Sequence, residues 1–434
     1  MDSKSHLVPR HLLLPFVLVT TLFFAWGFAN DITNPMVKAF SKIFRMSVMD
    51  GALVQLAFYG GYFAMAFPAA LFIRKYSYKA GILVGLALYA GGALLFIPAS
   101  MTGVYYPFLV AYFILTCGLS FLETSSNPYI LTMGDEATST RRLNLAQAFN
   151  PIGSLLGMFT AMTFIQARLN PLSTAERAVL SPEEFEAVKH TDLQVLITPY
   201  VAVGLVVLIL FLVIRFTKMP KNADRAHSLH IGRALKRIFS ISRYREGVIA
   251  QFFYVGVQIM CWTFIIQYGT RIFVSQGMNE QAAEVLSQRY NIVAMAIFCV
   301  SRFVCTFLLK YVSPGKLLMA LAIGGAVLIT GVIGFRDIWG LYCLVGVSAC
   351  MSLMFPTIYG IALQGLGEDA KFGAAGLIMA ILGGSVMPPL QAAIIDCGVV
   401  WGIPAVNVSF VLPLIGFLVI IHYGHRSYSV HGKK

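Results

Sequence analysis

Long apolar stretches, separated by short polar segments, follow one another along the whole 434-residue chain. A helix that crosses a bilayer needs about 20 predominantly apolar residues. The pattern predicts twelve such helices, at residues 12–40, 50–73, 80–100, 104–133, 143–168, 194–217, 246–272, 287–311, 315–335, 338–364, 371–395 and 401–424. Gly and Pro recur inside these stretches, which multi-span membrane proteins tolerate. We therefore expect an all-α membrane protein.

The composition supports this class. Hydrophobic residues make up 58% of the chain and charged residues only 12%, and the mean hydropathy is +0.76, which is too apolar for an ordinary soluble domain. The first apolar stretch has no small-residue cleavage site and is expected to be a retained span rather than a signal peptide. The net charge of +13 does not indicate nucleic-acid binding, because the basic residues are concentrated in loops between spans, where they set orientation in the bilayer.

The central polar segment divides the predicted spans into two sets of six. A faint repeat supports this division, since Tyr76–Gly81 after the second span resembles Tyr311–Lys316 after the eighth. Repeats of this kind are typical of carriers with two six-helix halves around a site near the membrane midplane. We expect two pseudo-symmetric bundles, at residues 1–217 and 246–434, joined by a basic cytoplasmic linker at 218–245.

The loops predict the orientation of the chain. Most Lys and Arg residues, including those of the central segment, fall on the same side as both termini, so both termini are expected to be cytoplasmic in the plasma (inner) membrane. On the opposite side, Ser181 followed by Pro182, Glu183 and Glu184 predicts the start of a short helix with a structural role in the loop 169–193.

Two carboxylates inside apolar stretches are the first candidates for chemistry. Glu123 lies in the fourth predicted span and Asp31 in the first. An ionised residue costs roughly 2.5 kcal/mol or more at the membrane centre and usually serves ion or substrate movement. Burial favours the neutral form of a carboxyl group, so such a residue can take up a proton near neutral pH. The alternative for each is a structural ion pair or hydrogen bond.

Neutral polar side chains in the spans are the candidates for substrate contacts. Gln251, Tyr254 and Gln258 fall on one face of a helix, with Trp262 one turn further; the alternative is that they join neighbouring helices by hydrogen bonds. Many amides beside few charges suit a neutral polyol. The full set comprises Asn30, Asn34, Gln147, Asn150, Gln251, Tyr254 and Gln258.

Arg302, inside the eighth span, is an intramembrane cation that requires a partner, and we expect it to be a gating or structural charge. The seven cysteines form no CxxC pair and have no His at ligand spacing, so neither a disulfide nor a metal site is expected. Nucleotide-binding and hydrolase motifs are missing from the sequence. The chain is therefore predicted not to be an enzyme and to have no cofactor.

Several motifs together resemble the fucose permease family of the major facilitator superfamily, which consists largely of sugar:proton symporters. The motifs are Phe23–Asp31, Gln55–Phe63, Tyr76–Gly81, Leu122–Pro128, Arg142–Gln147, Ala250–Gln258 and Ser301–Phe303. The resemblance implies that Glu123 is the glutamate at which substrate and proton are coupled, and that Gln147 and Asn150 line the sugar cavity. The family's fucose transporter has its span-one aspartate three positions later, where this chain has Asn34, so Asp31 is about one turn away from the family position.

We expect, as a hypothesis, a carrier that imports L-fucose or a related neutral hexose with a proton by alternating access. Glu123 would be the protonation site and Asp31 would assist coupling. The expected partners are a small neutral sugar and the lipid bilayer, without nucleic acid, and the expected state is a monomer. Two alternatives remain open, namely a sodium-coupled transporter of glucose, galactose or N-acetylglucosamine, and a sugar sensor that does not transport.

Overall fold

The computed structural model describes residues 7–33, 36–46, 53–172, 174–220 and 231–429. Within this part of the chain, eleven helical stretches are long and apolar enough to cross a membrane. The 23-residue helix α4 (Leu53–Lys75) coincides with the second predicted span. Every one of the twelve predicted spans thus has a helical counterpart.

Contacts divide the chain into two compact units. One unit contains residues 10–129 and 149–228, and the other contains residues 1–9, 130–148 and 229–434. This division differs from the bundle boundaries proposed from the sequence, because a short stretch around residues 130–148 groups with the second half of the chain. The boundaries at 217 and 245 remain a prediction.

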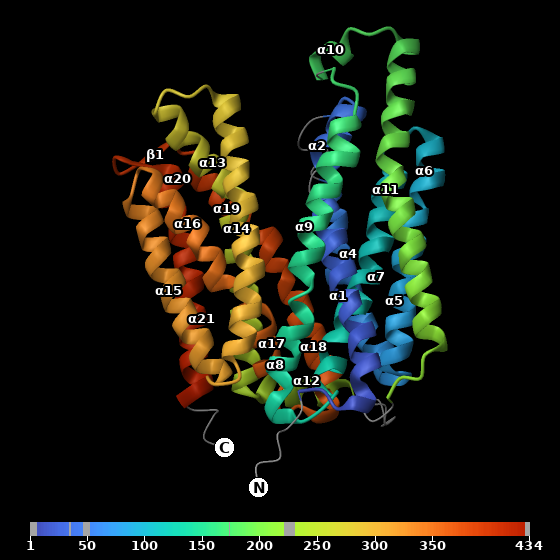
Figure 1. The fold of residues 1–434 in the computed structure, drawn as a ribbon, viewed down its shortest axis with the longest axis vertical. Helices are drawn as coiled ribbons and strands as arrows, with labels where there is room; N and C mark the ends of the chain where they lie inside the picture. Colours follow the sequence, from blue (N-terminus) through green and yellow to red (C-terminus); the bar gives the residue numbers. More distant parts are fainter. Residues whose placement is uncertain (1–6, 34–35, 47–52, 173, 221–230, 430–434) are drawn as a thin grey trace. The chain divides into compact units, whose positions relative to one another are not determined.

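The first unit is a bundle of long helices (Figure 1). Helix α1 packs closely against α9, since a Cβ atom added at Gly27 would lie 2.1 Å from the Asn150 carbonyl oxygen. The helices are α1 (Leu13–Thr33), α2 (Met36–Ile43), α4, α5 (Tyr78–Leu94), α6 (Phe96–Thr102), most of α7 (Tyr106–Leu131), α9 (Asn150–Thr160), α10 (Thr174–Ala178) and α11 (Pro182–Phe216).

The second unit is also helical, with one small hairpin. Its helices are α8 (Ser139–Gln147), α12 (Ile231–Ser240), α13 (Ser242–Ser275), α14 (Glu280–Leu308), α15 (Pro314–Gly334), α16 (Ile338–Met351), α17 (Met354–Leu363), α18 (Ala370–Met379), α19 (Gly383–Ile395), α20 (Ala405–Val408) and α21 (Val411–Ser429). Strands β1 (Val399–Val400) and β2 (Ile403–Pro404) pair antiparallel. Trp401 and Gly402 between them have φ values of 51° and 72°, as in the tight turns that favour hairpins.

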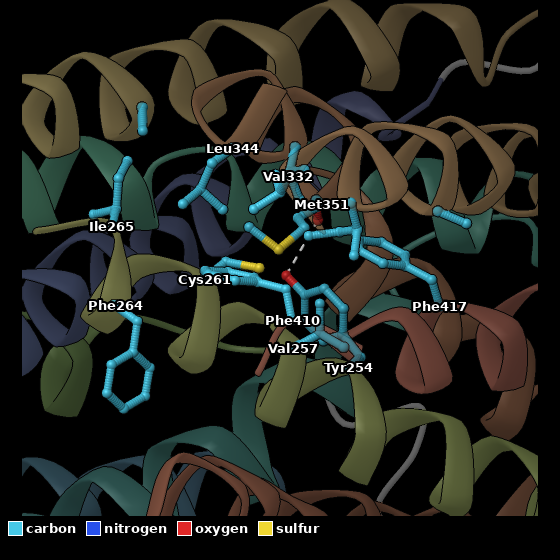
Figure 2. Packing of buried hydrophobic residues seen from close by; sticks show 14 of the residues in the cluster. Tyr254, Val257, Cys261, Phe264, Ile265, Val332, Leu344, Met351, Phe410 and Phe417 are labelled. Carbon is cyan, nitrogen blue, oxygen red and sulfur yellow. Dashed lines mark hydrogen bonds between the residues drawn. The ribbon is translucent and has the colours of Figure 1, made fainter. Parts of the chain in front are cut away.

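Helix α13 lies at the centre of the second unit. Its buried side chains, among them Tyr254 and Cys261, pack with residues of α15, α16 and α21, as Figure 2 shows. The Tyr254 hydroxyl donates to the Met351 carbonyl at 3.1 Å. Small residues allow close helix packing, which drives association inside lipid; at Gly325 a Cβ atom would meet the Phe417 ring at 2.4 Å.

Several predicted continuous spans are interrupted, which corrects the sequence interpretation. The span predicted at 80–100, for example, divides into α5 and α6. The span predicted at 143–168 divides into α8 and α9, and the span at 338–364 divides into α16 and α17. Proline explains both breaks, because it lacks an N–H and clashes with the carbonyl four residues earlier. Pro151 and Pro356 lie in the first turns of the second halves. The span at 371–395 is likewise divided, into α18 and α19.

The prediction of a short helix after Ser181 is also wrong. Ser181 does form a capping box with Glu184, in which the side chains satisfy backbone N–H groups at the helix start. The helix that begins there is α11, which continues for 35 residues. The loop predicted at 169–193 is therefore shorter than expected.

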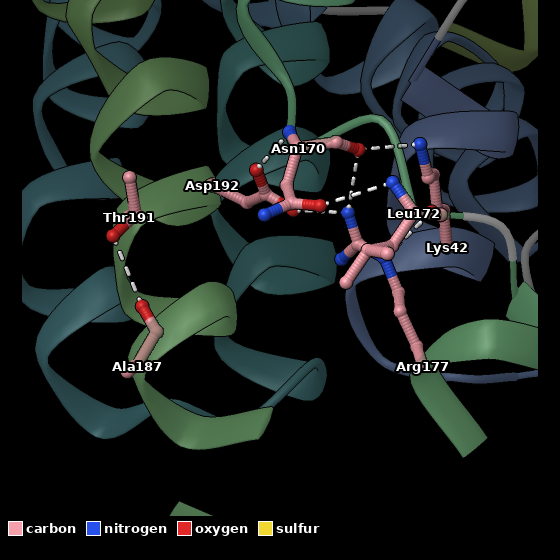
Figure 3. Close-up of polar contacts among 7 residues, drawn as sticks. All are labelled: Lys42, Asn170, Leu172, Arg177, Ala187, Thr191 and Asp192. Carbon is pink, nitrogen blue, oxygen red and sulfur yellow. Dashed lines mark hydrogen bonds and ion pairs between the residues drawn. The ribbon is translucent and has the colours of Figure 1, made fainter. Parts of the chain in front are cut away.

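A buried polar cluster fixes the loop before α11 to its neighbours (Figure 3). Arg177 of α10 and Asp192 of α11 form an ion pair at 2.6 Å, with side-chain exposures of 0% and 1%. The Asn170 N–H donates to Asp192 at 2.8 Å. The Asn170 carbonyl accepts from Lys42 of α2 at 2.6 Å and from Arg177 at 3.0 Å. Every contact joins groups of opposite charge or a donor to an acceptor, so this cluster has the character of a structural support.

Candidate functional site

Glu123 of α7 lies at the centre of the first unit's polar site. It is 4% exposed, and its carboxylate accepts hydrogen bonds from the Tyr62 hydroxyl of α4 and the Trp26 indole of α1. The Trp26 ring stacks on Phe23 at a centroid distance of 4.6 Å, which fixes its orientation. Within the described residues, no ion pair involves Glu123. Two neutral donors therefore hold a buried acid that has no counter-charge in this part of the chain.

Asp31 of α1 is the second carboxylate of this unit and is 8% exposed. It interacts electrostatically with the partly buried phenol of Tyr59. Tyr59 interacts in the same way with Tyr62, one turn along α4. The two tyrosines therefore connect the surroundings of Asp31 with those of Glu123. Asn30 is partly exposed, and Asn34 lies outside the described residues.

Asn144, Gln147 and Asn150 are spaced three residues apart in the predicted fifth span, and the break after Gln147 divides them between α8 and α9. Asn144 of α8 is fully buried and donates to Thr357 of α17 at 3.1 Å, so it joins two helices. Gln147 ends α8 and is 4% exposed. Asn150 begins α9, where its amide donates to the Phe23 carbonyl at 3.2 Å.

The polar residues predicted on the seventh span all lie on the continuous helix α13. Gln251 is fully buried, and neither its amide nitrogen nor its amide oxygen has a hydrogen-bond partner in the described part of the chain. The Tyr254 hydroxyl donates to a backbone carbonyl, as described above. Gln258 is half-buried. Gln251 therefore has a fully buried amide whose hydrogen-bonding capacity is unused within the described residues.

Arg302 of α14 is buried, with 3% exposure. Its Nε donates to the Ser352 carbonyl, and its Nη1 donates to the Gln147 carbonyl at 3.1 Å. The guanidinium also lies over the Phe298 ring, 4.6 Å from the ring centroid, a distance suited to a cation–π contact. Among the described residues, Arg302 forms no ion pair.

The two carbonyls that Arg302 contacts are the ones that proline releases. Residue 147 lies four positions before Pro151, and residue 352 lies four positions before Pro356. A proline cannot donate to the carbonyl four residues earlier, and a freed carbonyl inside a membrane needs another donor. One guanidinium supplies that donor to both breaks, so Arg302 joins α8 to the junction between α16 and α17.

Sequence reasoning missed Trp26, Tyr59 and Tyr62 as members of the site. Tyr59 and Tyr62 are spaced by three residues within an apolar helix, which places two hydroxyls on one face. That spacing was available in the sequence. In a chain with 33 Phe and 19 Tyr, however, aromatic residues do not distinguish a site from ordinary packing.

Metal binding was not expected, and the described residues contain no group of three or more His, Cys, Asp or Glu side chains able to hold an ion. The free cysteines in this part of the chain are scattered and mostly buried.

Comparisons with known proteins agree with the fold. The model of the Major Facilitator Superfamily matches residues 18–389. The L-fucose-proton symporter of Haemophilus influenzae is 52% identical, over 99% of this chain and 100% of that protein. The L-fucose-proton symporter of Escherichia coli K12 is 35% identical, over 89% and 88% of the two chains. The crystal structure of FucP in the outward conformation has a TM-score of 0.87 and 33% identity, over 96% of this chain and 99% of that one.

These findings confirm the fold class of twelve transmembrane helices in two six-helix bundles, and they show a multi-pass membrane protein. They also confirm that the chain is a transporter and not an enzyme. The similarity extends over nearly the full length of the chain and of its relatives. The chain therefore belongs to the Major Facilitator Superfamily and, within it, to the fucose permease family.

Proposed function

We propose that this protein imports L-fucose together with a proton by alternating access. The observation that carries the proposal is Glu123, a carboxylate buried among membrane-spanning helices and held by two neutral donors. A structural acid would be expected to have a counter-charge, whereas an acid that must lose its charge during transport is better served by neutral neighbours. The names of the two bacterial relatives support the substrate and the coupling ion.

The hydrogen bonds of Glu123 supply a coupling mechanism. The ionised carboxylate can accept from both Tyr62 and Trp26, whereas a protonated carboxyl group has fewer acceptor sites and becomes a donor itself. Protonation therefore frees one donor and adds another. Sugar hydroxyl oxygens can accept hydrogen bonds from both the freed donor and the protonated carboxyl group. Proton uptake in this way improves the site for a neutral sugar, and the carrier then exposes the site to the other side of the membrane with the acid neutral and the sugar bound. Asp31 assists through Tyr59.

Sugar contacts are proposed for the neutral polar set. Gln251 has the strongest support, because a buried amide without partners costs about 1–3 kcal/mol, a cost that sugar hydroxyls would remove. Tyr254 already donates its hydroxyl hydrogen, so its oxygen would act as an acceptor. The proposed set is Asn30, Asn34, Gln147, Asn150, Gln251, Tyr254 and Gln258.

Arg302 is proposed as the gating charge. It is hydrogen-bonded to the carbonyls of Gln147 and Ser352, at the ends of α8 and α16. Cations are favourable at helix C-termini, so this arrangement stabilises the state in which the two ends lie together. Alternating access requires them to part, and the loss of these bonds gives that step an energy barrier.

The orientation is proposed from the distribution of basic loops, with both termini cytoplasmic in the inner membrane and the linker at 218–245 between bundles at 1–217 and 246–434. Arg237 of α12 pairs with Asp369 at 2.5 Å, which ties the linker helix to the loop after α17. We propose a monomer as the working unit, since one chain supplies the twelve helices of this fold.

The decisive experiment is uptake of labelled L-fucose into liposomes that hold the purified protein. Inward proton and sodium gradients are imposed separately, and unlabelled hexoses compete. Accumulation that requires the proton gradient and is competed best by L-fucose supports the proposal. Accumulation with sodium alone would favour the sodium-coupled alternative. Sugar binding without any flux would reject transport and favour a sensor.

A further inference from the structure

A pocket of about 610 Å³ lies beside the last turns of α13. Under the proposed orientation, this end of the helix is the outer end. The start of α14 and the short helix α20 lie at the same end of the second unit (Figure 1). The walls include Ile266, Gln267, Thr270, Arg271, Glu284 and Val406. The volume falls in the usual range for small-molecule sites, about 300–1,000 Å³.

The lining groups define the chemistry of a ligand. Gln267 offers an amide, Thr270 a hydroxyl, Arg271 a guanidinium and Glu284 a carboxylate, so donors and acceptors are both present. Arg271 donates one bond to Asn407 at 3.3 Å and retains further N–H groups. Because Arg271 and Glu284 have opposite charges, the pocket wall has no net charge that would attract a monovalent ion. This combination suits a neutral molecule with several hydroxyls.

The pocket also has an apolar wall and lies on a face of α13 that continues toward the proposed transport path. Gln258, Trp262, Ile266 and Thr270 repeat every four residues and are all half-buried. Successive residues at this spacing are neighbours on the helix surface and form a stripe that winds around α13 by about 40° at each step. The stripe extends for roughly 18 Å between Gln258 and Thr270. Sugar contacts proposed at Gln258 are therefore connected along α13 to the pocket.

We propose that this pocket is a second sugar site, which captures a neutral hexose at the outer end of α13 before the sugar reaches Gln258. The inference rests on the proposed transport function and adds a separate capture step to it. Gln267 and Arg271 hold the sugar hydroxyls, and Ile266 and Val406 contact its apolar face. A capture site of this kind raises the effective concentration of sugar at the path and acts on KM rather than on the maximal rate.

Cys397 provides a reporter for this site. It is exposed, whereas the other free cysteines of the described residues are buried or partly buried, and it precedes Gly398 in the pocket wall. A membrane-impermeant maleimide is applied to proteoliposomes with and without L-fucose, and Cys397→Ser gives the background. We expect L-fucose to slow labelling in the parent protein and in Gln258→Leu, but not in Gln267→Leu.

Transport kinetics give the second measurement. Gln267→Leu and Arg271→Gln should each raise the KM for L-fucose about 3- to 10-fold, the loss of one hydrogen bond, with little change in maximal rate. The matched controls are Gln276→Leu, at the end of the same helix, and Arg336→Gln. Both are exposed and do not line the pocket.

Equal protection in Gln267→Leu and Gln276→Leu would overturn the second site, and so would a parent protein that transports L-fucose without protecting Cys397. Failure of the transport proposal gives a different result. A parent protein without L-fucose uptake, whose Cys397 is still protected by another hexose in a Gln267-dependent way, would reject L-fucose as the substrate and support the pocket.

Discussion

The buried polar cluster around Arg177 and the Glu123 site bury charge in opposite ways. In the cluster, the Asp192 carboxylate meets the Arg177 guanidinium at 2.6 Å and also accepts a backbone N–H. At the site, the Glu123 carboxylate accepts from the neutral donors Tyr62 and Trp26 and has no ion pair among the described residues. A buried ion pair stays charged, because protonation of its carboxylate would leave the partner cation buried without a counter-charge. A carboxylate with neutral donors can be protonated without that loss.

Arg302 is a third solution to the same problem. Its charge meets backbone carbonyls that proline has released, rather than an acid. Carbonyl oxygens cannot titrate, so the charge stays constant while the contacts can be made and broken by movement of the helix ends. The comparison therefore distinguishes three roles: the Arg177–Asp192 pair is a structural support, Glu123 is a titratable site, and Arg302 forms a movable contact. Each has its own expected response to substitution.

The largest effect is expected from breaking the pair. Arg177→Met leaves the Asp192 carboxylate buried without its cation, which costs about 3–5 kcal/mol of stability. The double variant Arg177→Met/Asp192→Leu should recover most of that loss. Thermal unfolding of the detergent-solubilised proteins measures both. If the single variant were no less stable than the double one, the cluster would not be a structural ion pair.

Glu123→Gln should differ from Arg177→Met, because it should impair transport without lowering stability. Glutamine still accepts one hydrogen bond but cannot exchange a proton. A charge that crosses 100 mV gains roughly 2.3 kcal/mol, which corresponds to about fiftyfold accumulation. We expect the ratio of internal to external L-fucose to fall from about fifty to about one, while exchange of internal for external sugar persists.

The control for this variant is Glu246→Gln, since Glu246 pairs with Arg426 at 3.2 Å and has no role in the proposed coupling. It should retain proton-driven accumulation. Uphill uptake that survives in Glu123→Gln would remove Glu123 as the proton site.

The sequence predicts the fold well because each span is a long apolar stretch, and length alone identifies it. It predicts Glu123 for a related reason, since a lone acid in such a stretch is conspicuous. The donors to that acid come from other helices, and no local pattern indicates which of many aromatic residues they are. The division of the fifth and tenth spans was predictable in principle from Pro151 and Pro356. That both freed carbonyls meet Arg302 depends on tertiary packing.

Arg302 allows a sharper test of the movable contact. Lysine keeps the positive charge but lacks the planar fork that reaches two carbonyls at once. Arg302→Lys should therefore lose one of the two bonds, lower the barrier to parting of the helix ends and raise the initial uptake rate by about tenfold, equivalent to about 1.4 kcal/mol. Arg289→Lys is the matched control, because Arg289 is exposed on the same helix. Equal rates in the two variants would assign no gating role to Arg302.

Tyr62→Phe should produce the smallest effect and the most specific one. It removes one of the two donors to the ionised form of Glu123 while Trp26 remains, so the proton is held up to a higher pH. We expect the pH of half-maximal uptake to rise by about 0.5–1 unit. Tyr129→Phe is the matched control, because Tyr129 is a buried tyrosine of α7 whose hydroxyl donates to the Pro220 carbonyl at 2.8 Å. A structural loss alone would lower the rate in both variants without moving the profile. A shift confined to Tyr62→Phe would show that neutral hydrogen bonds set the protonation of the site, which is the property that distinguishes it from the paired cluster.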